Sequence, residues 1–154
     1  MIRILLFVSL FFFPIKSNAL IEVDITRGNL NPLPIAVSPL SIDDNSKKNF
    51  EKILKKKNIG SEIAIVVENN LKASGLFNPL NKDAFLQAPD IANLKPRFED
   101  WNLIKAQALI TGKVNFVNDK LRVEFRLWDV LAGKEMMALA FTTVPSNWRR
   151  VGHI

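Results

Sequence analysis

The sequence predicts an α/β fold, a three-layer domain in which helices cover both faces of a five-stranded mixed sheet. Residues 108–144 contain three consecutive segments with the two-residue period of a β-strand. Residues 21–26 and 35–37 also have strand character, and helical spacing occurs between the early and the late strands. The whole chain has 154 residues, enough to bury the core of one ordinary domain.

The late strands give the strongest signal. Between residues 120 and 127, apolar side chains alternate with charged ones, as in a sheet with one buried and one wet face. Asn118-Asp119 tolerates the positive φ of a two-residue hairpin turn, so segments 108–117 and 120–130 should be antiparallel neighbours. A second tight turn at Ala132-Gly133 should lead into a third strand, 137–143.

Residues 1–19 have the pattern of a secretory signal peptide. Arg3 precedes an apolar run, and small residues precede a cleavage site expected after Ala19. The run has about ten apolar residues, short of the roughly twenty that cross a bilayer. We therefore expect an exported domain of residues 20–154. Without cysteine, it would have neither disulfides nor a lipid anchor.

The positive charge is concentrated in one segment. Loss of residues 1–19 would lower the net charge from +6 to +4. Six lysines lie between residues 47 and 57, with Glu51 as the single acid: Lys47, Lys48, Lys52, Lys55, Lys56 and Lys57. A nucleic-acid surface is normally broader and interleaved with aromatic residues, so we expect no nucleic-acid partner.

This lysine-rich segment has two interpretations. Phe50, Ile53 and Leu54 have helical spacing and predict a short amphipathic helix. It could be a solvated helix that docks through these three residues. Alternatively, its lysines could contact an anionic membrane surface or lipid A, since each lysine near such a surface contributes about 1 kcal/mol.

The early strands differ in their environment. Ile21, Val23 and Ile25 alternate with polar residues, which predicts a strand, and we expect it at an edge of the sheet. Segment 35–37 is apolar on both faces and is closed by Pro39, as expected for a strand near the centre.

Three helical segments should cover the sheet. Ser61 is a good N-cap and Gly75 a good stop, and the first helix between them should pack through Ile63, Val67 and Leu71. A long connection to Pro96 follows, which apolar residues should attach to the surface. These are Phe85, Leu86 and Ile91.

The second helix is expected at 98–106, with Phe98, Trp101 and Ile104 on one face. The third should start after Pro145-Ser146. The sequence stops within it, which suggests a truncated reading frame.

The sequence contains no catalytic or cofactor signature. His153 is the single histidine, so neither a Ser-His-acid relay nor a histidine-rich metal site can form. Asp43-Asp44 and Glu99-Asp100 are explained by a turn and a helix N-terminus, and the glycines form no phosphate loop. We expect no enzyme activity, no cofactor, no metal and no small-molecule substrate.

Four features together resemble the TolB N-terminal domain family of the Tol-Pal system. They are EVDITRG (22–28) followed by the strand bounded by Pro34 and Pro39; the helix end LKASGLF (71–77); the tryptophan helix running into ALITGKV (108–114); and the terminal WRRVGHI (148–154). Each is weak alone, but their order and spacing cover the whole mature chain. Two departures are a longer lysine-rich segment, 46–59, and the absence of the six-bladed β-propeller that follows in the family.

The resemblance implies a scaffold for protein contacts, with an anticodon-binding-domain-like fold. The propeller would bind Pal, and the segment after the signal peptide would engage the TolA C-terminal domain, supporting outer-membrane integrity and envelope constriction during cell division. The residues carried over are Ile21, Glu22, Val23, Asp24, Ile25, Thr26 and Arg27. An edge strand beside a chain terminus can add to a partner's sheet. The alternative is a free-standing periplasmic adaptor of the same fold, acting on cell-wall synthesis or contacting anionic envelope lipid.

Overall fold

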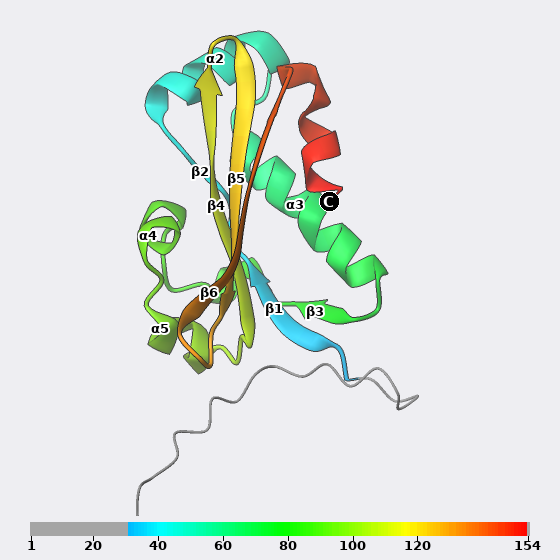
Figure 1. The fold of residues 1–154 in the computed structure, drawn as a ribbon, viewed down its shortest axis with the longest axis vertical. Coiled ribbons are helices and arrows are strands. Elements are labelled where there is room, and N and C mark those ends of the chain that lie inside the picture. The colour runs from blue at the N-terminus through cyan, green and yellow to red at the C-terminus, as the bar shows by residue number, and fades with distance from the viewer. Residues whose placement is uncertain (1–30, 154) are drawn as a thin grey trace, which may run out of the picture.

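The computed structural model describes residues 31–153, so the predicted signal peptide and the predicted strand at 21–26 lie outside the described residues. The described chain forms a mixed sheet between helical layers, which confirms the predicted α/β class (Figure 1). The strands are β1 (Leu33–Val37), β2 (Ser41–Ile42), β3 (Phe77–Pro79), β4 (Ala108–Val117), β5 (Lys120–Asp129) and β6 (Lys134–Thr143). The helices are α2 (Asp44–Leu54), α3 (Ile59–Ala73), α4 (Pro89–Leu94) and α5 (Phe98–Leu103), with 3-10 segments η2 (Lys82–Ala84) and η3 (Pro145–Gly152).

The strands are parallel in one half of the sheet and antiparallel in the other. Its strand order is β3-β1-β4-β5-β6, and β2 pairs with the far part of β4. The pairs β1–β3, β1–β4 and β2–β4 are parallel, whereas β4–β5 and β5–β6 are antiparallel. Of the five expected strands, four fall in the described residues and all four are present, whereas the described sheet has six strands. The two additional strands, β2 and β3, have two and three residues, too few to produce a periodic pattern.

The β4–β5 hairpin has the predicted turn. Asn118 and Asp119 both adopt positive φ, 50° and 59°, and the register pairs Val117 with Lys120. These φ values are those of a two-residue turn whose twist matches that of the strands. Gly133 has φ 63° in the connection to β6, as a tight turn requires.

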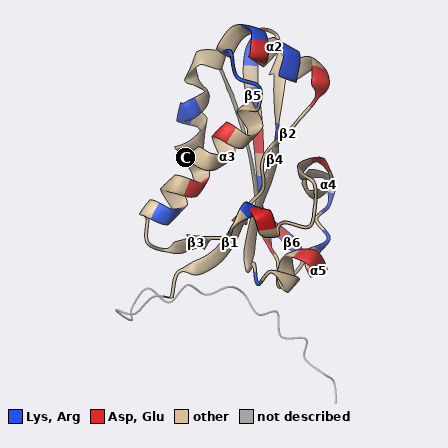
Figure 2. Cartoon of the chain, turned by 180° about the vertical axis from the view of Figure 1, so that it is seen from behind, with Lys and Arg blue, Asp and Glu red and all other residues tan. Residues whose placement is uncertain are grey.

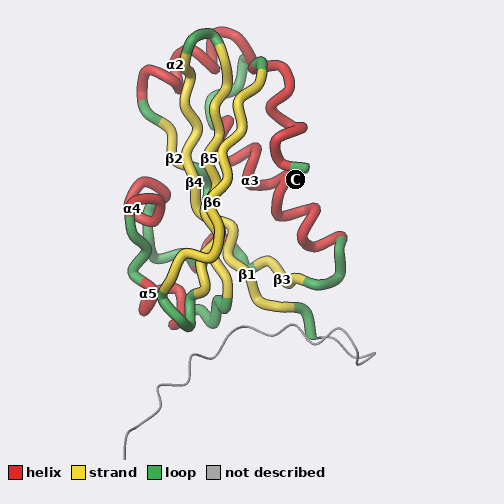
Figure 3. The backbone as a smooth tube through the Cα atoms, viewed as in Figure 1, coloured by secondary structure: helices red, strands yellow, loops and turns green. Residues whose placement is uncertain are grey.

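Two apolar cores lie on opposite faces of the sheet. The first lies between the sheet and α2, α3 and η3, and the second lies under α4 and α5 (Figures 1 and 3). Phe50, Ile63, Leu121 and Val123 are fully buried in the first core. The second is built around Trp101, packed edge-on against Phe85. Strand β1 lies inside the sheet, between β3 and β4, and its Ile35 and Ala36 are buried, as predicted for a strand near the centre.

Helix α3 begins earlier than predicted. Its first residue is Ile59, its N-cap is Asn58, and Ser61 lies inside the helix instead of capping it. Burial of Ile59 overrides the local capping preference of Ser61, and Gly60 lies so close to Leu40 that a Cβ there would be 2.2 Å from the Leu40 carbonyl oxygen. The predicted stop is confirmed, since Gly75 follows the helix with φ 72°.

Three residues expected to dock are exposed. Ile53 is 50% exposed, because α2 packs through Phe50 and the partly buried Leu54. Leu86 and Ile91 are also exposed. Phe85 attaches the connection 76–96 as predicted, together with the buried Ala92 of α4 and with β3. The tertiary context of a short segment, rather than its apolar residues alone, decides which side chains are covered.

Candidate interaction surfaces

The lysine-rich segment forms one end of the domain. Helix α2 and its C-terminal connection carry all six lysines, five of which are exposed and one, Lys56, half-buried (Figure 2). The helix is fixed from below by Phe50, which packs edge-on against Phe116, and by the buried Ser46 hydroxyl, which accepts a hydrogen bond of 2.7 Å from the Phe116 N–H. The lysines therefore project from a helix that is fixed to strand β4. Ile53 gives this surface an exposed apolar side chain.

Lys56 differs from its neighbours. Its ammonium lies 3.1 Å from a Glu62 carboxylate oxygen and 4.9 Å from the centre of the Trp148 ring. The guanidinium of Arg149 lies 4.7 Å from the same ring. A cation above an aromatic face is attracted by the ring quadrupole. Lys56 therefore connects the lysine-rich segment to η3 and is occupied by structural contacts.

The start of α2 is stabilised by Asp43. Its carboxylate accepts a hydrogen bond of 2.9 Å from the Ser46 N–H, the N-cap interaction. The hydroxyl and the backbone N–H of Ser46 hold the pKa of Asp43 below its ordinary value. Asp44 lies in the first turn of the same helix. Asp43 and Asp44 therefore lie at a helix N-terminus instead of in the predicted turn.

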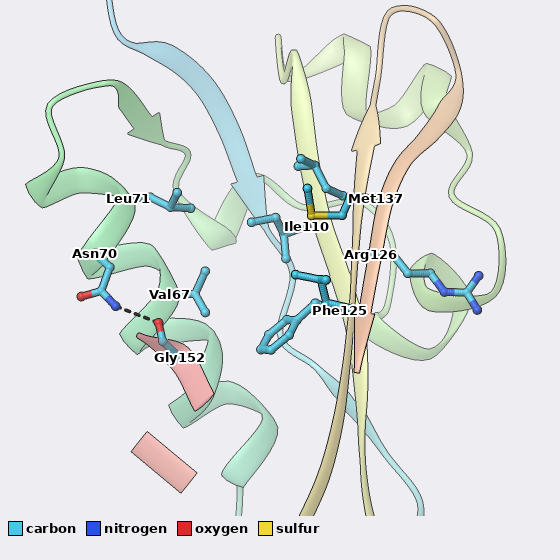
Figure 4. Close-up of a pocket in the computed structure, with 10 residues that line it drawn as sticks. Val67, Asn70, Leu71, Ile110, Phe125, Arg126, Met137 and Gly152 are labelled. Atoms are coloured by element: carbon cyan, nitrogen blue, oxygen red, sulfur yellow. Dashed lines mark hydrogen bonds between the residues drawn. The ribbon is translucent and has the colours of Figure 1, made fainter. Parts of the chain in front are cut away.

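A second surface follows β6, the last strand of the described sheet. Met136 and Met137 are about half exposed, and Leu139 is 39% exposed. An apolar pocket of about 170 Å³ lies beside them (Figure 4). Its lining comes from α3, η3 and the three antiparallel strands: Val67, Asn70, Leu71, Ile110, Phe125, Arg126, Leu127, Met137, Leu139 and Gly152.

The wall of this pocket is held by hydrogen bonds between α3 and η3. The Asn70 side-chain amide donates to the Gly152 carbonyl oxygen at 2.7 Å and lies 3.0 Å from Nδ1 of His153 (Figure 4). Gly152 is required here, because a Cβ would meet Val66 at 2.7 Å. His153, the single histidine, therefore contacts an amide at the chain end and has no acidic or hydroxyl partner among its described hydrogen bonds.

The opposite face of the same strands carries a row of charges. Lys113 and Arg122 both bind the carboxylate of Glu124, at 3.3 and 3.0 Å, and Arg126 reaches Glu135 on β6 at 3.5 Å. Burial opposes ionisation of Glu124, but the hydrogen bonds and charges of Arg122 and Lys113 outweigh it and hold its pKa below its ordinary value. Three cations share two carboxylates on this face.

The remaining catalytic candidates have structural roles. Asp100 lies in the first turn of α5, where its carboxylate accepts hydrogen bonds from the Arg97 guanidinium and from Gln87. No group of three or more metal-ligating side chains occurs in residues 31–153. Over the same residues, every helix is too short or too polar to cross a membrane.

Some of the predicted site residues lie outside the described part of the chain. Residues 21–27, the predicted TolA-type strand, lie outside the described residues and stay a prediction. The β6 surface was missed, because its alternating pattern resembles that of a strand covered on one face. Met136 and Met137 are the one sequence signal of this surface, but in the sequence alone two methionines are interpreted as core residues.

The fold defines a class of protein domain, the three-layer α/β domain with a mixed sheet between helices. Residues 21–136 match the family described as the TolB amino-terminal domain. The chain belongs to this family.

Two relatives illustrate the similarity. The chain is 81% identical over 149 residues to the Tol-Pal system protein TolB of Pelagibacter ubique (strain HTCC1062), covering 97% of this chain and 33% of that protein. The crystal structure of TolB from Acinetobacter baumannii is similar with a TM-score of 0.57 and 20% identity, covering 79% of this chain and 26% of the other. The second similarity supports the fold alone. The chain spans about a third of the length of the curated relative.

Proposed function

We propose that this chain is the N-terminal interaction domain of a periplasmic component of the Tol-Pal system. The observation that supports the proposal most strongly is the 81% identity to a Tol-Pal system protein, together with the family match over residues 21–136. The acids and the histidine described above have structural partners, which favours binding over catalysis. Residues 1–19 would direct export and be removed near Ala19.

The proposed partner of the N-terminal segment is the C-terminal domain of TolA. Residues 21–27 alternate apolar and polar side chains and precede β1, which pairs with β3 on one side and β4 on the other. A segment of this kind near a chain terminus can be released at low cost and can pair with a partner's strand. In the longer proteins of the family, the propeller would bind Pal. The complete assembly would support outer-membrane integrity and constriction during division.

Deletion of residues 20–27 tests this contact. We expect the deletion to abolish binding to the TolA C-terminal domain, measured by isothermal titration calorimetry. The matched control replaces Lys47, Lys48 and Lys52 of α2 by Gln and should bind normally. Circular dichroism of both variants checks the fold. Undiminished affinity of the deletion variant would end the proposal.

A second candidate function is supported by the α2 surface. Its exposed lysines surround the exposed Ile53, a combination typical of helices that bind anionic membrane surfaces. A free-standing adaptor would use this surface on envelope lipid, or act on cell-wall synthesis. Co-sedimentation with vesicles containing anionic lipid, with and without Lys→Gln replacement of the six lysines, tests the lipid contact. Unchanged sedimentation would exclude an electrostatic role for them.

A further inference from the structure

Strand β6 is a long edge without a strand neighbour on its outer side in the described sheet. It has ten residues, and its exposure pattern is almost entirely that of surface. Every second residue of an edge strand directs its N–H and C=O groups away from the neighbouring strand. About half of β6 can therefore offer backbone hydrogen bonds to another strand.

The two faces beside this edge differ in chemistry. Met137, Leu139 and Phe141 pair with Leu127, Phe125 and Val123 of β5, so they lie on the apolar face. Ala138 and Thr142 pair with Arg126 and Arg122, on the charged face. The side chains of β6 on the charged face are small, and the Arg126 guanidinium already reaches Glu135 on β6. Figure 4 shows Arg126 pointing away from the apolar pocket.

Two hollows follow the apolar side of β6. The pocket of about 170 Å³ includes Met137 and Leu139, and a second hollow of about 390 Å³ is lined by Phe141, Thr142, Thr143, Arg150, Val151 and His153. Helix α3 and Gly152 of η3 form the opposite wall of the pocket, and Arg150 and Val151 of η3 form that of the second hollow. Apolar side chains entering from a new strand would therefore find room beside β6.

We propose that β6 is a docking site for an extended segment of another protein, which adds to the sheet as a seventh strand. Its recognition would require apolar side chains on the face toward Leu139 and acidic side chains on the face toward Arg122 and Arg126. The apolar face supplies burial, and the three cations that share two carboxylates supply charge complementarity. This site lies at the opposite edge of the sheet from β3, and it uses none of the residues of the proposed TolA contact.

A second copy of this chain is a poorer occupant. The β6 strand of another molecule would present Ala138, Ala140 and Thr142 on the charged face. The carboxylate of its Glu135 already binds Arg126 of its own sheet. A second copy would therefore bring no free acid to the cations of β5, whereas a strand with acidic residues would.

The test uses two synthetic peptides and the purified protein. The first peptide has ten residues, alternating valine and glutamate, and the second has lysine in place of glutamate. We expect fluorescence anisotropy to detect binding of the first peptide alone, with amide hydrogen exchange slowed in β6. Arg126→Glu should weaken binding at least tenfold, and Lys48→Glu, a change of the same charge on α2, should leave it unchanged.

Each other outcome overturns the proposal. Equal binding of both peptides would exclude charge recognition, and unchanged exchange in β6 would exclude strand addition. A helical circular dichroism spectrum of the bound peptide would mean that the hollows bind a helix and not an added strand. Concentration-dependent dimerisation of the protein that slows exchange in β6 would make a second copy the occupant. Thermal unfolding of Arg126→Glu checks that a loss of binding is not a loss of fold.

Discussion

The two edges of the sheet are protected very differently. Strand β3 has three residues and ends in Pro79, and the chain returns directly from it into η2. Strand β6 has ten residues without proline and exposes three large apolar side chains. A short edge with proline resists pairing with other chains, whereas a long apolar edge invites it. Stability should therefore be concentrated from β1 to β5, and β6 should tolerate change.

The largest expected effect is a difference in stability between the two regions, measured with the same Leu→Ala substitution on β5 and on β6. Leu121→Ala on β5 removes a fully buried side chain from the first core and should lower the free energy of unfolding by about 2–5 kcal/mol. Leu139→Ala on β6, the same change on the same face one strand further out, should cost less than about 1 kcal/mol. Urea unfolding monitored by circular dichroism measures both. Equal losses would contradict the comparison, because they would mean that β6 is covered.

An intermediate loss of stability is expected when a buried hydrogen bond between β4 and β5 is removed. The Trp128 indole N–H donates to the Thr111 hydroxyl at 2.8 Å, both residues being buried. Trp101 is also buried, but its indole N–H has no partner among the described atoms. Trp128→Phe should therefore destabilise the domain by about 1 kcal/mol more than Trp101→Phe. Thermal unfolding of the two variants checks this order, and the reverse order would show that packing dominates.

The smallest effect concerns the N-cap of α2. Asp43→Ala should lower the free energy of unfolding by about 0.5 kcal/mol near neutral pH. The folded pKa of Asp43 is lowered, so its stabilisation is present above the unfolded pKa and is lost as the pH falls through the folded pKa. Asp43→Asn retains a good cap and should remove this part of the acid dependence. Urea unfolding between neutral and acidic pH tests it, and identical pH profiles for wild type and Asp43→Asn would refute the assignment.

The sequence predicts most of the late fold because its signals are local. Positive φ at Asn118 and Asp119 and alternation along β4 and β5 define the hairpin without reference to distant residues. Strand β3 could not be predicted, because three residues show no period and their partner, β1, is more than forty residues away. The start of α3 was misplaced because burial of Ile59 is a tertiary effect.

The candidate surfaces were less predictable than the fold. The lysines were found, because charge is visible in composition, but the role of Lys56 on Trp148 required the structure. The exposure of β6 depends on the lack of a covering element, and no residue within β6 reports what lies beside it. Alternation identifies the two faces of a strand but does not show whether the strand is at an edge.

The pairing of β1 with β4 has a consequence for the order of folding. These strands pair Ile35 with Ala108, whereas β4, β5 and β6 pair within fewer than forty consecutive residues. Closing a long loop is slower than closing a hairpin, so the meander should assemble first and β1 should be inserted into a sheet that already exists. We expect pulse-labelling hydrogen exchange to protect amides of β4 and β5 before those of β1. Until that insertion, the nascent meander would expose both of its outer strands, and a holding chaperone would be most useful in that interval.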